Sequence, residues 1–228
     1  TTARAVVLTY HPYTDGFVSA LAEAWTQGAM DADVEVTVIN VASLSFDLAL
    51  RVGHREDQPL EPDLIAVKAA IEDAAHLVIA FPTWWGGLPA TLKGLFDRLF
   101  LPGWAFSIEN GQIKPGLKER SARILTTMDA PVWYDSLVYG ASGRRQLRYA
   151  ILQYSGVKPV WTNTFGKIGD SSLGSRERML AQCRAVGQQD AKRLLTRFPT
   201  PSDTAHHRDS SRPLSGGGTG HPGIIEAN

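Results

Sequence analysis

The segment AFPTWWGGLPATLKGLFDRLF, residues 80–100, places two tryptophans in a turn that prolines and glycines already make. Prolines fix the backbone at both ends of this turn, and two glycines allow a ligand to approach the backbone closely. Backbone N–H groups held in this way can donate to ring nitrogens and oxygens, while the indoles of Trp84 and Trp85 supply a stacking wall. Burial of both indoles in the core is the alternative, but adjacent loop residues rarely both point inward. The pattern therefore favours a site for a flat ligand.

A second candidate site follows the first apolar run of the chain, in the stretch HPYTDGFVSA. The N-terminus of a helix offers free N–H groups and a favourable dipole to a phosphate, whatever its glycine content. His11, Thr14 and Gly16 would line such a pocket, and Phe17 would cover a sugar or a ring. An ordinary turn, capped by Thr14 or by the aspartate after it, explains the same residues. The sequence leaves both interpretations open.

A third candidate site is the stretch TTMDAPVWYD, residues 126–135, which brings together two hydroxyls, an acid and two aromatic rings. Thr126 and Thr127 could bond the polar edge of a ligand. Tyr134 could polarise a carbonyl or a ring oxygen, or it could be a partly buried or interface tyrosine. Asp129 could act beside such a ring or cap its own loop. The residue types suit a bound ring with a polar edge.

Apolar runs of strand length alternate with helical patterns along the chain. The runs predict five strands, at residues 3–10, 34–41, 76–81, 121–128 and 158–165. The 3.6-residue periodicity predicts five helices, at residues 16–30, 63–75, 89–100, 143–156 and 175–198, the last with Ser175 as its N-cap. This alternation predicts an α/β fold, a doubly wound five-stranded parallel sheet with helices on both faces. In the strand order 2-1-3-4-5, as in flavodoxin, the three candidate loops meet at one edge of the sheet.

The composition limits the classes of function. Lys+Arg equals Asp+Glu at 23 each, so no basic excess drives binding to nucleic acid or to an anionic membrane. The single cysteine, Cys183, excludes an internal disulfide and a cysteine-based zinc site, and its helical context predicts a buried, inert thiol. No metal site is expected, because the following histidines have no ligand spacing with carboxylates: His54, His76, His206, His207 and His221.

Several motifs are missing from the sequence. The first strand is not followed by G-x-G-x-x-G, and no G-x-x-x-x-G-K-[ST] occurs, which argues against a dinucleotide-binding Rossmann loop and a P-loop nucleotidase. Hydrolase chemistry lacks a nucleophile, because there is neither a G-x-S-x-G elbow nor a Ser-His-Asp order. Lys93 and Asp97, spaced four residues apart, are expected to form an ion pair on the surface of a helix.

The 228 residues, 43% of them hydrophobic, suit one domain over residues 1–198. A Pro/Gly/Ser-rich arm follows at residues 199–228, and we expect it to pack on a second subunit. No apolar stretch approaches the ~20 residues of a membrane span. The first ten residues, TTARAVVLTY, lead into a strand without a signal-peptide pattern. These features predict a cytoplasmic enzyme.

With a first strand ending at His11, and with the segments FPTWWGGLPATLKGLFDRLFLPGWAF and TTMDAPVWY, the sequence resembles the flavodoxin-like NAD(P)H:quinone oxidoreductase family. The resemblance covers about residues 3–198 and is most specific in the first of these two segments. It implies a homodimer with a flavin at the subunit interface. It also implies a ping-pong reaction, in which a hydride passes from NAD(P)H to the flavin and two electrons then pass to a quinone or a similar acceptor.

The resemblance also assigns residues to the site. It places His11 and Phe17 at the flavin phosphate and sugar, with Ser19 close to a small residue beside the phosphate. It places the active-site tyrosine at Tyr134, with Asp129 as a second candidate for catalysis. The remaining residues that it places along the flavin are Pro82, Thr83, Trp84, Trp85, Gly86, Thr126 and Thr127.

The sequence departs from the family at three positions. Met128 and Asp129 replace a common Gly-Gly pair, and a carboxylate near the ring would alter its redox potential. Gly86 stands where some members have a bulky aromatic residue, which should widen the acceptor pocket. Gly140 stands where some members have a histidine, so protons would come from Tyr134, from Asp129 or from water.

Other assignments stay open at this stage. FAD is slightly favoured over FMN, because the segment 46–63 is long enough to help hold an adenosine moiety. Reduction of azo or nitro groups at the same site is one alternative function. A regulatory flavoprotein subunit of a potassium efflux transporter is another, since relatives of the family have that role.

Overall fold

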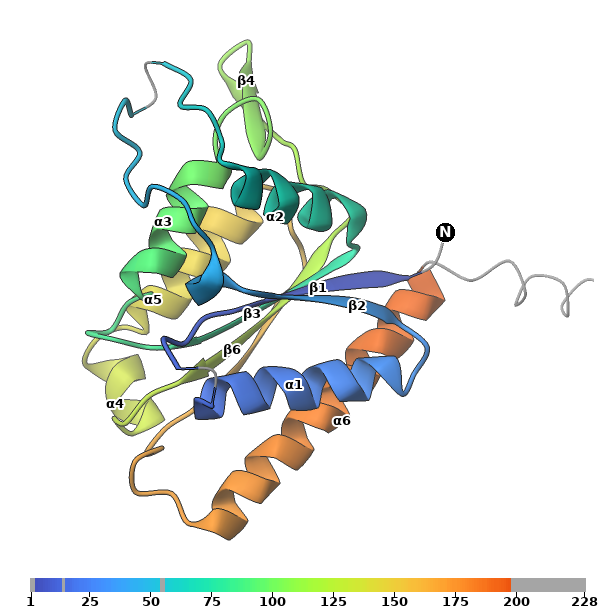
Figure 1. Cartoon of the computed structure of the whole chain (residues 1–228), viewed down its shortest axis with the longest axis vertical. Coiled ribbons are helices and arrows are strands. Elements are labelled where there is room, and N and C mark those ends of the chain that lie inside the picture. Colours follow the sequence, from blue (N-terminus) through green and yellow to red (C-terminus); the bar gives the residue numbers. More distant parts are fainter. Residues whose placement is uncertain (1–2, 14, 54–55, 198–228) are drawn as a thin grey trace, which may run out of the picture.

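Figure 1 shows the computed structural model, which describes residues 3–13, 15–53 and 56–197. In this part of the chain, five parallel strands form one sheet in the order β2-β1-β3-β6-β7. The strands are β1 (Arg4–Thr9), β2 (Glu35–Asn40), β3 (His76–Pro82), β6 (Ser121–Thr127) and β7 (Val160–Phe165). The predicted strand order and fold class are therefore confirmed. The roles predicted for Thr14, for His54 and for the arm at 199–228 lie outside the described residues.

The central strands are apolar because helices cover both faces of the sheet. Every residue of β3 and β6 is buried, as expected for parallel strands with no face toward water. Helices α1 (Phe17–Met30) and α6 (Leu173–Arg197) lie on one face in Figure 1. Helices α2 (Pro62–Asp73) and α3 (Ala90–Leu99) lie on the other face, together with the π-helix η2 (Gln146–Gln153). The predicted arrangement of helices on two faces is confirmed.

An antiparallel hairpin, β4 (Phe106–Glu109) and β5 (Gln112–Pro115), lies outside the main sheet and was not predicted. Its turn residues Asn110 and Gly111 both have positive φ angles, of 52° and 74°. Asn-Gly is the preferred pair for this kind of two-residue turn. The Asn-Gly pair could therefore have predicted this hairpin, but the prediction considered only the longer strands and helices.

The helical elements differ from the prediction at three places. The short helix α4 (Val132–Leu137) forms within the third candidate loop, and the predicted helix 143–156 is divided between α5 (Ser142–Arg145) and η2. Helix α6 begins before Ser175, whose backbone N–H donates to the hydroxyl of Ser172 at 3.3 Å. The serine that caps the helix is thus the earlier one. A short 3₁₀ turn, η1 (Val41–Ser43), follows β2.

Helices α1 and α6 cross in close contact through two glycines. A Cβ atom on Gly28 would lie 2.1 Å from the carbonyl oxygen of Arg184, and one on Gly187 would lie 2.2 Å from that of Trp25. Cys183, in the same contact, is fully buried, and burial raises its pKa to about 12. A thiol held protonated in this way agrees with the predicted inert role.

Two observations concern the surface of the described chain. The predicted ion pair on α3 is present, with Lys93 Nζ 2.7 Å from Asp97 Oδ1. Among the described residues, no helix combines the length and the apolar character needed to cross a membrane.

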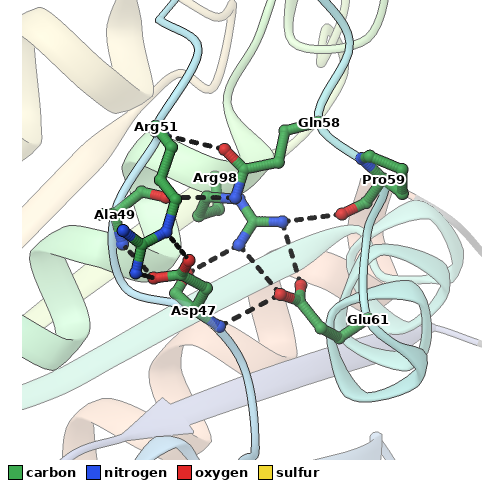
Figure 2. Close-up of polar contacts among 7 residues, drawn as sticks. All are labelled: Asp47, Ala49, Arg51, Gln58, Pro59, Glu61 and Arg98. Carbon is green, nitrogen blue, oxygen red and sulfur yellow. Dashed lines mark hydrogen bonds and ion pairs between the residues drawn. The ribbon is translucent and has the colours of Figure 1, made fainter.

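The connection between β2 and α2 is held against α3 by one buried arginine. Figure 2 shows that Arg98 donates to the carbonyl oxygens of Asp47 and Pro59, at 2.6 and 2.8 Å, and to both carboxylate oxygens of Glu61, each at 3.0 Å. The side chain of Arg98 is fully buried. Hydrogen bonds from Arg98 lower the pKa of Glu61 below its usual value. Gln58 completes the cluster by bonding Ala49 and Arg51 of the same connection.

A second buried polar cluster lies at the amino-terminal ends of β3 and β6. His76 begins β3, and its Nδ1 lies 2.8 Å from the hydroxyl of Ser121, which begins β6. His76 Nε2 lies 3.6 Å from Asp190 of α6. Asp190 also accepts hydrogen bonds from both Nε and Nη2 of Arg123 and, at 3.1 Å, from the indole of Trp25. This cluster lies at the edge of the sheet opposite the candidate loops.

The cluster predicts that stability falls in mild acid. Burial lowers the pKa of His76, the nearby Asp190 raises it in part, and the charges of Arg123 and Arg193 lower it further. At a pH below about 6.5 the unfolded chain therefore binds a proton that the native chain rejects, so the free energy of unfolding rises with pH through this range. We expect a slope of up to about 1.4 kcal/mol per pH unit between pH 5.5 and 6.5.

Urea denaturation at several pH values would measure this slope. The His76→Gln variant lacks the titrating ring, and its stability should depend less on pH over the same range. Equal slopes for the two proteins would show that His76 is not the responsible group.

Candidate functional site

Two adjoining pockets lie at the carboxyl ends of the strands, at the edge where parallel α/β sheets bind ligands. The first, which we call the helix-side pocket, has a volume of about 220 Å³. It is lined by His11, Phe17, Val18, Pro82, Thr83, Trp84, Thr127, Met128, Asp129 and Ile168. The predicted meeting of the three candidate loops at one edge is therefore confirmed.

The second pocket, which we call the turn-side pocket, has a volume of about 510 Å³. It is lined by Thr83, Trp84, Trp85, Gly86, Met128, Asp129, Ala130, Asp135 and Tyr139. Four residues line both pockets, so the two share one wall: Thr83, Trp84, Met128 and Asp129. A long ligand with a flat ring at one end can extend across this wall.

The N-terminus of α1 closes one end of the helix-side pocket. Its N-cap residue is Gly16, and no described side chain accepts a hydrogen bond at the cap. Phe17 and Val18, the first residues of the helix, line the pocket, so N–H groups of the first turn remain available to an anion. The ring of His11 is held by Tyr13, whose backbone N–H donates to Nδ1 at 3.1 Å.

A guanidinium group that the sequence analysis did not consider lies beside this pocket. Arg176 packs 5.5 Å from the centre of the Phe17 ring. Its Nε donates to the hydroxyl of Ser171 at 2.9 Å and its Nη2 to the carbonyl oxygen of Ile168 at 3.2 Å. Arg176 thus fixes the loop after β7 against the first turn of α1, and it adds positive charge near the anion-binding end.

The two tryptophans occupy different environments. Trp84 lines both pockets, is 42% exposed and meets the ring of Tyr10 edge-to-face at 6.0 Å. Trp85 lines the turn-side pocket alone and is fully exposed. Backbone hydrogen bonds in both directions between Trp84 and Gly87 close a two-residue turn around Trp85 and Gly86. The expectation that at least one indole faces a cleft is confirmed for both.

The loop after β6 forms the floor between the pockets. Thr127 lines the helix-side pocket, and its carbonyl oxygen accepts a hydrogen bond of 2.7 Å from the backbone of Thr83. Thr126 is fully buried, and its hydroxyl lies 2.7 Å from that of Thr83. Asp129 is exposed in both pockets and accepts a 2.9 Å hydrogen bond from the backbone of Gly169. Thr126 therefore supports the wall of the site from behind.

Tyr139, not Tyr134, lines the turn-side pocket. The two rings meet edge-to-face at 5.3 Å, and Tyr134 also packs against Trp133. A side-chain hydrogen bond with Tyr134, followed by its charge, raises the pKa of Tyr139 above the ordinary value. Tyr139 is next to Gly140, the position at which some family members have a histidine. The pocket thus has a protonated hydroxyl close to the position of the missing imidazole.

The structure brings most of the predicted site residues together. Of the residues assigned to the flavin, Ser19 and Thr126 line neither pocket, and Thr14 lies outside the described residues. The sequence analysis gave no binding role to Val18, Ala130, Asp135, Tyr139 or Ile168, although all five line a pocket. Ile168 follows β7, an edge strand whose carboxyl end was not considered as part of the site. Asp135 and Tyr139 belong to α4 and the turn after it, which the sequence did not predict.

The donor set fits a flavin. The helix-side pocket offers free N–H groups to a phosphate, and the shared wall offers aromatic and backbone surface to a ring. The segment 46–63 does not contribute, because none of its described residues lines either pocket and Arg98 holds it against α3 (Figure 2). The argument from that segment for FAD over FMN is therefore not supported.

The comparison with protein families agrees with the fold and the site. A family model described as "Flavodoxin-like fold" matches residues 3–186, and the chain belongs to this family. Among curated proteins, an uncharacterised NAD(P)H oxidoreductase of Haemophilus influenzae is 26% identical over 197 residues, which cover 83% of this chain and 96% of that protein. NAD(P)H dehydrogenase (quinone) 1 of the guinea pig, Cavia porcellus, is 26% identical over 125 residues. That match covers 46% of this chain and 45% of the guinea-pig protein, so it spans about half of each.

Solved structures show the same fold at low identity. An NAD(P)H:quinone oxidoreductase from Methanothermobacter marburgensis superposes with a TM-score of 0.69 at 24% identity, covering 82% of this chain and 96% of that one. An FMN-dependent NADH-azoreductase from Bacillus anthracis, solved in complex with FMN, superposes with a TM-score of 0.63 at 14% identity, covering 85% and 99%.

Proposed function

We propose that this protein is a flavin-dependent oxidoreductase that transfers two electrons from NAD(P)H to a quinone or a similar flat acceptor. The observation that carries the proposal is the pair of adjoining pockets at the carboxyl edge of the sheet, one with helical N–H donors and one walled by indoles. Relatives named as NAD(P)H oxidoreductases and quinone dehydrogenases support this assignment.

The roles of the residues follow from their positions. The chemistry that a flavin supplies when bound is two-electron transfer between NAD(P)H and an acceptor. The first turn of α1 would hold its phosphate, and Thr83, Trp84 and Thr127 would hold its ring. The turn-side pocket would receive the reduced nicotinamide and the acceptor one after the other, because a single slot serves both. Such alternation is a ping-pong mechanism.

Proton transfer is assigned to the polar groups of the turn-side pocket. Tyr139 holds its hydroxyl proton and can donate to an acceptor oxygen, while Tyr134 orients it. Asp129, fixed by Gly169, is the second proton carrier and places a negative charge beside the ring. This division keeps Asp129 in its predicted role, changes Tyr134 from the proton donor to a residue that orients Tyr139, and assigns the donation to Tyr139.

A homodimer is part of the proposal. Apolar side chains are exposed on α4, which contributes Asp135 to the turn-side pocket, with Trp133 62% and Leu137 79% exposed. A second copy of the chain would cover such surface near the site. The measured molar mass in solution tests this directly.

The proposed function is tested by identifying the bound cofactor and then its substrates. Heat release followed by chromatography would distinguish FAD from FMN, and NADH and NADPH would be compared with quinones and azo dyes as acceptors. Several structural neighbours are azoreductases, so the ratio of quinone to azo turnover defines the substrate class. A colourless protein that takes up neither flavin would contradict the proposal. A flavin-loaded protein with negligible turnover of every acceptor would favour a regulatory role instead.

Replacing Tyr139 with phenylalanine should lower kcat with a quinone by roughly 100-fold, the lower end of the range for loss of a general acid. Flavin content should stay the same, because Tyr139 lines the turn-side pocket and not the helix-side pocket, and its ring is retained. The Tyr134→Phe variant should show a smaller loss, since it acts through Tyr139. A larger effect of Tyr134→Phe in steady-state assays would return the role of proton donor to that residue.

A further inference from the structure

The turn that carries Trp85 has a backbone that suits other residues better. Trp85 and Gly86 have φ angles of 52° and 71°, the pattern of a type I′ turn with both central residues left-handed. Glycine adopts this conformation freely and asparagine tolerates it, whereas a bulky side chain does so at a cost. The Asn110–Gly111 turn of the same chain has nearly identical angles with the preferred residue pair. Trp85 is therefore an exception within its own protein.

The exposed position of Trp85 provides no packing to offset this cost. Its relative exposure is 105%, so the indole touches little of the folded chain. It borders the turn-side pocket, where a flat molecule could lie against it. Strained residues that persist at a pocket are candidates for a functional role.

A second segment clamps the turn in place. The carbonyl oxygen of Gly86 accepts hydrogen bonds from the hydroxyl of Ser142 and from the backbone N–H of Gly143, each at 2.8 Å. The contact is close, because a Cβ on Gly143 would lie 2.8 Å from Cα of Gly87. The clamp joins the turn to the segment that carries Tyr139, whose Cβ would lie 3.8 Å from a Cβ on Gly86.

The clamping segment is itself fixed. Asp135 is buried, and its carboxylate accepts a 2.7 Å hydrogen bond from Arg144. Its carbonyl oxygen accepts another, of 2.9 Å, from the backbone of Ala141, which is also left-handed with φ of 53°. The turn and the segment 135–143, which both line the turn-side pocket, are thus parts of one bonded unit, and Ser142 is the side chain that joins them.

We propose that Ser142 is a positioning residue which, through the carbonyl of Gly86, holds the strained Trp85 at the mouth of the turn-side pocket as a stacking surface for the acceptor. This inference rests on the proposed function. The strain is kept because the indole must stand free of the fold to meet a flat molecule. Gly86 leaves room beside it, since a Cβ there would already lie 3.4 Å from the hydroxyl of Ser142.

The first test replaces Trp85 with asparagine, the residue that the chain uses in its other turn of this kind. We expect the melting temperature to rise by about 2–4 °C, because asparagine relieves the left-handed strain. In the flavin-loaded protein, the KM for 1,4-naphthoquinone should rise about 10-fold more than that for ferricyanide, which has no flat face. A fall in melting temperature, or equal changes for both acceptors, would overturn the proposal.

The second test separates positioning from simple structural support. Ser142→Ala should raise the KM for 1,4-naphthoquinone about threefold to tenfold, the loss expected for one hydrogen bond, with a smaller change in kcat. Ser142→Thr keeps the hydroxyl and should restore KM to within about twofold. Ser107→Ala, on the β4–β5 hairpin, is the matched control and should behave as the wild type.

The outcomes distinguish this inference from the proposed function. If the wild-type protein binds no flavin and reduces neither acceptor, the proposed function fails, and the stacking role fails with it. A rise in the melting temperature of Trp85→Asn would in that case show only that the Trp85 backbone is strained. If ferricyanide is reduced normally but Ser142→Ala and Ser142→Thr behave alike, the inference fails and the proposed function stands.

Discussion

Replacing Asp190 with alanine is expected to lower the free energy of unfolding by about 3–5 kcal/mol, the loss typical of breaking a buried ion pair. Asp190 is fully buried, and its carboxylate accepts hydrogen bonds from Arg123, Arg193 and Trp25. Burial alone would raise the pKa of Asp190, but hydrogen bonds from Arg123, together with the neighbouring His76, lower it below the usual value. The acid is therefore charged in the native protein, and its removal leaves the buried guanidinium of Arg123 without a neutralising carboxylate.

The loss of the Asp190 carboxylate should weaken more than its ion pair with Arg123. Arg123 also donates to the side chain of Asn163 on β7, at 2.5 Å, and lies over the ring of Trp161. Through Asp190 the same group connects β6 to α6, which covers one face of the sheet together with α1. Loss of the carboxylate should thus weaken the attachment of α6 to the sheet as a whole.

Urea denaturation of the variant would measure the effect, with Asp31→Ala as a matched control. Asp31, at the C-terminus of α1, pairs with Arg184 of α6. This pair is on the surface, so its loss should lower the free energy of unfolding far less. The double variant Asp190→Leu with Arg123→Met should recover part of the loss, because no charge then stays buried alone. A loss in Asp190→Ala as small as that in Asp31→Ala would show that the cluster contributes little to stability.

The sequence predicted the five central strands because each is a run of apolar residues too short for a helix. The fully buried β3 is the strongest example, since its hydrophobicity does not depend on which neighbour it pairs with. The sequence could not predict the two buried polar clusters, one around Arg98 and one around Asp190. Arg98 and Glu61 lie 37 positions apart, and Arg123 and Asp190 lie 67 apart, and no local pattern announces such partners. Buried charges are visible only once the fold brings them together.

The candidate site was predicted to the level of loops but not of side chains. Loop positions follow from the topology, so His11, Trp84 and Thr127 were found at the correct edge. Side-chain direction depends on turns that the sequence did not reveal. Tyr134 was assigned to the site from the resemblance, and because α4 was not predicted, Tyr139, which the turn after that helix brings to the pocket, was not considered. The left-handed backbone of Trp85 was equally invisible, since tryptophan is not a residue that signals a type I′ turn.

Replacing Arg98 with methionine is expected to cost about 3–4 kcal/mol of stability and to release the connection between β2 and α2. The guanidinium is the hydrogen-bond donor to the carbonyl oxygens of Asp47 and Pro59, and it pairs with Glu61 through two bonds (Figure 2). Methionine fills a similar volume but donates nothing, so the two carbonyl oxygens lose this donor, and Glu61 loses its ion pair and keeps the hydrogen bond from the backbone N–H of Asp47. The expected loss is below that for Asp190, because the side chain of Glu61 is 29% exposed and water can reach it.

Limited digestion with trypsin would detect the released connection separately from global unfolding. Arg51 lies within it and is held by Asp47 and Gln58, which restricts access to the peptide bond that follows. Arg98→Met should speed cleavage after Arg51 at a urea concentration where the rest of the chain stays folded. Lys93→Met, which breaks the surface pair on the same helix, is the control and should leave this cleavage unchanged. Adding Glu61→Gln to Arg98→Met should recover part of the stability, because no carboxylate is then left without a counter-charge. It should not restore the protection from trypsin, because the carbonyl oxygens of Asp47 and Pro59 still lack a donor. Unchanged cleavage in Arg98→Met would mean that backbone contacts alone hold this connection on α3.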